Sequence, residues 1–171
     1  MELNTTKTKI SLFILIVSSI FWLGGSIYRA IIAYTLFEPF SLIIKSEITY
    51  DILRQTLKLI GNVNVYVLIS YPIVLISFFI FLKLSQVKLK RDGWLFMISM
   101  ILLLFFPVEV YLSFLDLDFT YMVLFSNFDT NLALSKLIQR IAALGGLPAI
   151  GSLCYFTSIW IAIFQPLKKS V

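Results

Sequence analysis

The chain has 171 residues, of which 60% are hydrophobic and only 13% are charged, and its mean hydropathy is +0.96. A soluble domain is typically about 45–50% apolar and about 25% charged, so a water-soluble fold of this size is excluded. Histidine is absent, which excludes histidine-ligated metal centres and histidine-based catalysis. The net charge of +5 comes from dispersed basic residues, so the expected partner is the lipid bilayer and not nucleic acid.

The first long apolar segment covers residues 10–37. Two lysines precede it and the run Gly-Gly-Ser at residues 24–26 lies within it, a pattern that mimics a cleaved signal peptide. Apolar residues resume directly after Arg29, however. We therefore expect this segment to be an uncleaved first membrane span.

Three further apolar segments cover residues 63–82, 94–115 and 141–164. A bilayer core about 30 Å thick is crossed by about 20 helical residues, so each segment is long enough to span it. Helices satisfy every backbone polar group internally, which lipid requires. The sequence therefore predicts an all-α integral membrane four-helix bundle in which residues 1–171 form a single domain.

The stretches between these spans contain additional helical signals. Residues 47–60 and 129–143 have apolar residues at near-helical spacing with charges between them. Both stretches are predicted as amphipathic helices that lie at the outer interface between spans one and two and between spans three and four, or that extend the next span outward. Asp116 and Asp118 have the spacing of a metal-binding pair, but two acids are a weak signal, and we expect them in a solvated outer loop.

The distribution of lysine and arginine predicts the orientation of the spans. One side of the predicted topology carries more lysine and arginine than the other. The side with fewer basic residues carries most of the acidic residues. The richer side holds Lys7, Lys9, Lys83, Lys88, Lys90, Arg91, Lys168 and Lys169, and the other side holds Lys45, Arg54, Lys58, Lys136 and Arg140. We therefore expect both termini in the cytoplasm, in a plasma or inner membrane.

The stretch FFPVEVYL at residues 105–112 places Glu109 inside an apolar span. Glu109 lies about 23 Å beyond Trp94, and Arg29 lies about 28 Å beyond Ile10, at 1.5 Å per helical residue. A lone charge in hydrocarbon costs at least about 2.5 kcal/mol, so the matched depths predict an interior Arg29–Glu109 pair that fixes span one against span three. One alternative is a titrating or ligand-binding Glu109 in a crevice opened by the helix kink at Pro107. Another is an interfacial Glu109 that points at lipid head groups.

Small and polar residues at helical spacing predict which faces meet inside the bundle. On the middle spans this spacing selects Tyr66, Ser99 and Ser113 as the lining of a candidate crevice near Glu109. On the last span it selects Gly145, Ala149 and Ser152 as a helix-packing stripe, with a helix break expected before Pro148.

These residues leave three functions open. The first is a non-enzymatic accessory, assembly or protective subunit that acts through its helix faces, alone as a homo-oligomer or with another membrane protein. The second is a small-solute or ion transporter or channel that uses Glu109 and Arg29. The third is a lipid-binding or lipid-modifying membrane protein. We predict no catalytic residue, cofactor or metal, because the chain has no phosphate-binding loop and no nucleophile with a plausible base.

Overall fold

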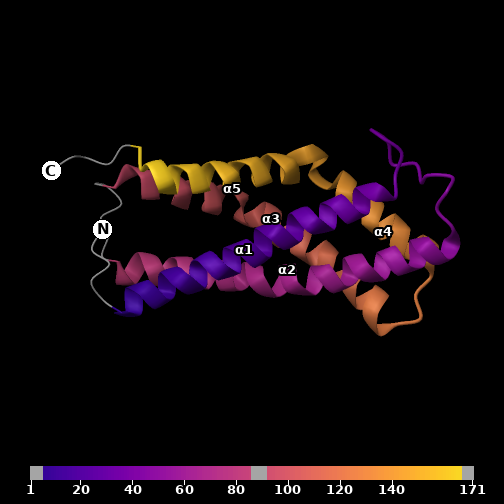
Figure 1. Cartoon of the computed structure of the whole chain (residues 1–171), viewed down its shortest axis with the longest axis horizontal. Helices are drawn as coiled ribbons and strands as arrows, with labels where there is room; N and C mark the ends of the chain where they lie inside the picture. The colour runs from indigo at the N-terminus through magenta and orange to yellow at the C-terminus, as the bar shows by residue number, and fades with distance from the viewer. Residues whose placement is uncertain (1–5, 86–91, 167–171) are drawn as a thin grey trace.

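A computed structural model describes residues 6–85 and 92–166, and these residues are almost entirely helical (Figure 1). The elements are α1 (Thr6–Thr35), α2 (Tyr50–Leu84), α3 (Gly93–Phe125), α4 (Thr130–Ala142), the 3-10 turn η1 (Ala143–Gly146) and α5 (Leu147–Phe164). In the described residues, four helical segments are long and apolar enough to cross a membrane: α1, α2, α3, and α4 to α5 taken together. The predicted all-α four-helix membrane bundle is confirmed.

The helices run side by side, so that α1 begins and α5 ends at one end of the molecule while α4 lies at the other (Figure 1). Close backbone approaches join α1 to α2, α2 to α3, and α3 to α5, whereas α1 and α5 are not among the closely packed pairs. Below, "the cap" denotes residues 33–60 and 119–142 at the α4 end, and "the membrane half" denotes residues 6–32, 61–84, 93–118 and 147–164.

The cap contains a conventional hydrophobic core. Leu57 and Ile60 of α2 are fully buried, and they belong to a cluster with side chains from the end of α1, the end of α3 and α4. Arg54 closes the edge of this core, because its guanidinium lies 4.4 Å from the ring centre of Phe128 and donates to the Phe128 carbonyl at 3.0 Å. The cap therefore packs as a small water-exposed domain does, with large side chains inside.

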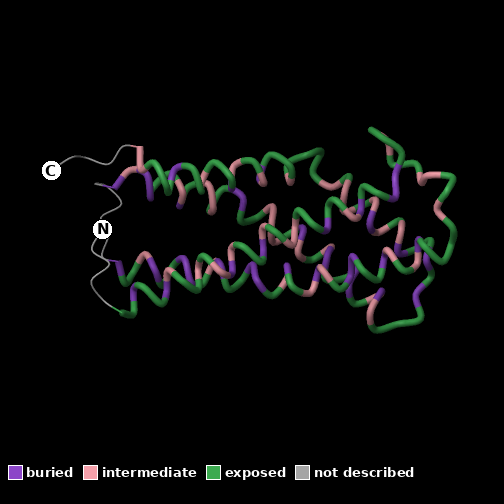
Figure 2. The backbone as a smooth tube through the Cα atoms, viewed as in Figure 1, coloured by how far each residue is buried: buried purple, intermediate pink, exposed green. Residues whose placement is uncertain are grey.

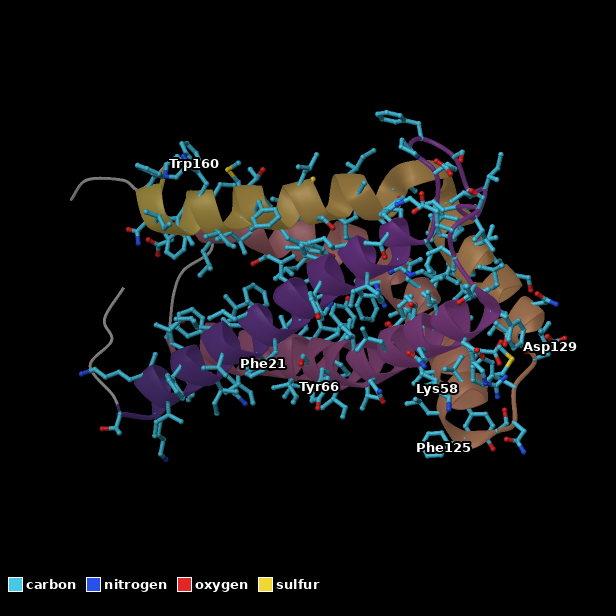
Figure 3. The ribbon with its side chains drawn as sticks, turned by 45° about the vertical axis from the view of Figure 1, so that its right-hand side comes forward. Phe21, Lys58, Tyr66, Phe125, Asp129 and Trp160 are labelled. Atoms are coloured by element: carbon cyan, nitrogen blue, oxygen red, sulfur yellow. The ribbon has the colours of Figure 1, made fainter. Side chains whose placement is uncertain are left out.

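The membrane half also buries clusters of aromatic and aliphatic side chains, but its outer surface is apolar as well. Large apolar side chains such as Phe21 and Trp160 point outward (Figure 3), and exposed positions dominate the outer faces of these helices (Figure 2). The helices meet where residues are small: a Cβ on Gly25 would lie 2.8 Å from Val67 across the α1–α2 contact. Such close approach at small residues is how helices associate in lipid, where burying apolar side chains gives little advantage over leaving them in the acyl chains.

Local signals explain where the helices begin and break. Thr49 precedes α2 and its hydroxyl accepts from the Ile52 amide, while Asp129 caps α4 by accepting from the Asn131 amide. The break between α4 and α5 contains the left-handed residues Leu144, Gly145 and Gly146, and Pro148 follows as the second residue of α5. Proline is tolerated in the first turn of a helix, because the amide that it lacks has no hydrogen-bond partner there. The helix break that was expected before Pro148 is present.

Two boundaries differ from the predicted spans, and the first agrees with the alternative that residues 47–60 extend the next span outward. The predicted second span, 63–82, is the middle of α2, which starts at Tyr50, so residues 50–60 extend that span rather than forming a separate helix. The third span was expected to end at residue 115, but α3 continues to Phe125 through both aspartates. The helices exceed the bilayer thickness because their extra turns are buried in the cap. Whether α4 lies at a membrane interface remains a prediction.

Candidate functional site: a charged cavity beside the cap

Arg29 is the centre of a buried polar cluster where the membrane half meets the cap. Its side chain is 7% exposed, and its Nη1 donates to Asp116 Oδ2 at 2.5 Å and to Asn64 Oδ1 at 2.9 Å. Helical spacing from Trp22 puts the arginine on the face of α1 that turns towards α2 and α3. One arginine thus connects α1 to both neighbouring long helices.

Asp116 of α3 binds a second arginine. Its Oδ1 accepts from Arg140 Nε of α4 at 3.1 Å, so each carboxylate oxygen takes one guanidinium. The aspartate side chain is 7% exposed and that of Arg140 is 18% exposed. Charge-assisted hydrogen bonds of this kind offset much of the cost of removing the three charges from water. The triad Arg29–Asp116–Arg140 carries a net charge of one positive unit by its composition.

The triad lies slightly more than one bilayer thickness from the end where α1 and α3 begin. Arg29 and Asp116 are each about 35 Å along α1 and α3 from the end where both helices begin, at 1.5 Å per residue. A bilayer core of about 30 Å that starts near the same end stops just before them.

Glu109 lies about 10 Å deeper than Asp116 on the same face of α3, because seven residues make almost two turns. It interacts by a side-chain hydrogen bond with Tyr155 of α5 and electrostatically with both arginines of the triad. In the described part of the chain no salt bridge joins Arg29 to Glu109, since Arg29 pairs with Asp116. The expected Arg29–Glu109 contact is therefore replaced by a longer-range interaction across a cavity.

That cavity has a volume of about 190 Å³ and lies between α1, α2, α3, α4 and α5. The three side chains of the triad and Glu109 line it, together with Asn64, Tyr155 and Trp22. Trp22 packs against Tyr71 with ring centroids 5.1 Å apart and against Tyr155 at 4.7 Å, so an aromatic layer closes the cavity towards the middle of the membrane half. The cavity is thus a one-sided polar space, positive near the cap and acidic at its floor.

The arginines offer more hydrogen-bond donors than the protein uses. Within the described residues, Arg140 makes its hydrogen bond through Nε alone, and Arg29 makes its bonds through Nη1 alone. A guanidinium has five N–H donors, so most donors of both groups remain for a ligand or water in the cavity. Planar guanidinium groups suit phosphate and carboxylate oxygens, so the donors of the upper cavity match the chemistry of such groups.

The candidate crevice residues are not brought together. Tyr66 is 63% exposed and projects from the outer face of α2 (Figure 3). Ser99 is buried, and its hydroxyl donates to the Leu95 carbonyl one turn earlier. Ser113 is half-buried, and none of the three lines the charged cavity. The polar side chain of α2 that enters the cavity is Asn64, which is 1% exposed.

The proposed packing stripe of the last span also lies elsewhere. Gly145 is exposed, has φ of +54° and has no atom within 4 Å of the position a Cβ would take, so it serves the turn before α5 and not a helix contact. Ala149 and Ser152 line the cavity. The glycine that packs is Gly151, where an added Cβ would lie 3.1 Å from Phe105 of α3.

Asp116, Arg140 and Asn64 are the cavity residues that the sequence reading missed. Asp116 was assigned to a solvated loop with Asp118, but on α3 two residues apart point to nearly opposite faces. Asp118 is exposed and pairs with Lys136, and the described residues contain no cluster of three metal-binding side chains. The spacing of seven from Glu109 to Asp116, on one helix face, was the signal that could have found the triad.

Comparison of this chain with protein-family models, with curated proteins and with solved structures finds no match. Its function must therefore be inferred from the cavity itself.

Proposed function

We propose that this multi-pass membrane protein is a non-enzymatic binding protein, and that its ligand is a small anionic group held in the cavity by Arg140 and Arg29. The single observation that supports the proposal is the cavity between the helices with unused guanidinium donors on its wall. The cavity volume of about 190 Å³ is below the roughly 300–1,000 Å³ of sites for drug-sized molecules. A phosphate or carboxylate group with a few attached atoms is of the right size.

This proposal develops the lipid- or ligand-binding alternative rather than transport. Towards the other end of the membrane half, the interior beneath the cavity is filled by Trp22, Tyr71, Phe105 and Tyr155 and then by further aromatic and aliphatic side chains. A solute would have to displace this layer to cross. A binding role needs only the cavity as it stands.

The test is to measure the binding of anions to the purified protein in neutral detergent. The probes are inorganic phosphate, glycerol 3-phosphate and a short-chain phosphatidic acid, and the readouts are calorimetry and native mass spectrometry. We expect Arg140→Gln to weaken the tightest probe about tenfold or more, because a charge-assisted hydrogen bond is worth about 1.5–3 kcal/mol.

The matched control is Lys136→Gln, which removes a cation from the same helix outside the cavity. It should change the affinity less than twofold. Equal losses in the two variants would indicate unspecific attraction of anions and contradict the proposal. Failure of every probe to bind the parent protein would also contradict it, and stable co-purification with another membrane protein would then favour the accessory function.

We further propose that the cap faces outward and the opposite end faces the cytoplasm. The support comes from the sequence, because lysine and arginine are more numerous in the segments that begin α1, join α2 to α3 and follow α5 than in the cap. Cysteine substitutions at the exposed positions Ser46 and Asn127 should react with an impermeant reagent added to intact cells, in a Cys154→Ser background. Labelling at Lys83 instead would reverse the orientation.

A further inference from the structure

We infer that the ligand of the cavity is an anionic phospholipid, which enters sideways from the membrane between α1 and α5. This inference rests on the proposed anion site and adds the identity of the ligand and its route. The phosphate would bind the donors of Arg140 and Arg29, and one acyl chain would lie in a groove on the outer surface between the two helices.

The groove is a separate feature of the α1–α5 face. It has a volume of about 790 Å³ and is lined by side chains of α1, α5 and the loop after α1. Ser26, Ala30, Tyr34, Ala149 and Ser152 line both the groove and the charged cavity. The two spaces are therefore adjacent, and the side chains that separate them are mostly small.

The arrangement of charge along the groove matches a lipid in its ordinary orientation. Lys45 lines the cap end of the groove, and the apolar residues Ile27, Ile31 and Leu153 line the remainder. Arg29 lies on the same helix at the depth where the hydrocarbon region ends. A lipid of the adjacent leaflet thus meets cations at its head-group level and apolar side chains along its chain.

Glu109 would determine how deep the phosphate of the lipid can enter the cavity. It lies about 10 Å deeper than Asp116, at the cavity floor beside Tyr155. A phosphate pushed to that depth would face a carboxylate, whereas a phosphate level with the triad faces the two arginines. The geometry holds the anionic group near the cap and leaves the floor for an uncharged or hydrogen-bond-donating part of the head group.

The deciding experiment separates the lipid from the free anion. Dioleoyl phosphatidylglycerol, dioleoyl phosphatidic acid, dioleoyl phosphatidylcholine and glycerol 3-phosphate are titrated against the full chain in detergent, with binding followed by native mass spectrometry. The groove variant is Leu153→Trp, which narrows the groove at a residue that does not line the cavity. The control is Ile163→Trp on the same helix, because the two side chains are exposed to a similar extent, 67% and 69%.

We expect the anionic lipids to bind at least tenfold more tightly than phosphatidylcholine and glycerol 3-phosphate. Leu153→Trp should weaken the anionic lipids about fivefold or more and leave glycerol 3-phosphate unchanged, while Ile163→Trp should change neither. If glycerol 3-phosphate binds as tightly as the lipids and Leu153→Trp has no effect, the lipid inference is overturned and the anion site stands. If no anion binds, both fall. Equal binding of phosphatidylcholine also overturns the inference.

Discussion

The cap and the membrane half use the same long helices and both bury large side chains, but they differ in their helix contacts and outer faces. In the cap, large aliphatic and aromatic side chains such as Leu57 and Phe119 are inside, 0% and 2% exposed. In the membrane half, equally large side chains such as Leu104 are outside, 69% exposed, and serine and glycine lie at the helix contacts. The boundary between the two regions is the layer of Arg29, Asp116 and Arg140.

We attribute the apolar outer faces of the membrane half to the lipid that candidate spans of this length and composition require. In water, burial of apolar surface is worth about 25 cal/mol per Å², so large side chains move inside. In lipid the outside is already apolar, and close van der Waals packing and polar contacts are what hold helices together. The layer of Arg29, Asp116 and Arg140 is held instead by buried ion pairs. Breaking these pairs is therefore expected to lower the stability of the protein more than any other change.

Asp116→Asn should therefore be the most damaging change. It removes the shared acceptor of two buried guanidinium groups, and breaking a buried pair in this way typically costs about 3–5 kcal/mol. Unfolding of the purified protein by SDS titration in mixed micelles measures the loss. Asp118→Asn is the matched control, because that side chain is 62% exposed and its pair with Lys136 is worth about 0–1 kcal/mol. Similar losses at the two positions would show that the triad is not stabilising.

Leu57→Ala tests the packed core of the cap. Leu57 is fully buried, and deletion of such a side chain typically costs about 2–5 kcal/mol through lost transfer energy and the cavity left behind. Leu104→Ala is the counterpart in the membrane half, where the side chain is exposed to the surrounding lipid or detergent. We expect less than about 1 kcal/mol there. A large loss at Leu104 would mean that this surface is buried against another protein chain, as a homo-oligomer or an accessory subunit requires.

The sequence was sufficient for the architecture because the long apolar segments leave few alternatives in lipid. It was also sufficient for Arg29, since a charge in such a segment must face inward. The sequence was insufficient for the ends of the helices, which were predicted from the length needed to cross a bilayer. The third span was therefore ended at residue 115, which left Asp116 outside its helix. The extra turns exist because the cap buries them, and the packing of the cap depends on residues far apart in the chain.

The helix faces show a second limit of sequence reasoning. Spacing alone selected Tyr66 on α2, yet the face that turns inward contains Asn64, Val67 and Tyr71. Small and polar residues occur on both faces of α2, so composition does not determine which face meets α1 and α3. The close contact between Gly25 and Val67 does determine it, and that contact is visible only in three dimensions.

Gly25→Ala should destabilise the membrane half by about 1–3 kcal/mol, the usual cost of overpacking. The added methyl would lie 2.8 Å from Val67 Cγ2, so α1 and α2 would have to separate. Gly24→Ala is the neighbouring control, since no atom lies within 4 Å of its Cβ position. Alanine favours the helix over glycine, so this control should be neutral or slightly stabilising in the same SDS titration. Equal behaviour of the two variants would contradict close packing at this contact.

The smallest effect is expected at Thr120 of the cap, and it should be a gain. Its hydroxyl is buried, and among the described residues it has no hydrogen-bond partner. An unpaired buried polar group costs about 1–3 kcal/mol, so Thr120→Val, which keeps the branched shape, should raise stability by about 1 kcal/mol.

Thr130 provides the opposite case, because its buried hydroxyl donates to Tyr50 and accepts from Arg54. Thr130→Val should therefore lower stability by about 1–2 kcal/mol, since it leaves Tyr50 and Arg54 without that partner. Thermal unfolding in detergent would measure both changes. If both variants shift stability in the same direction, hydrogen bonding does not decide the cost of a buried hydroxyl in the cap, and the comparison of the cap with a water-exposed core fails at that point.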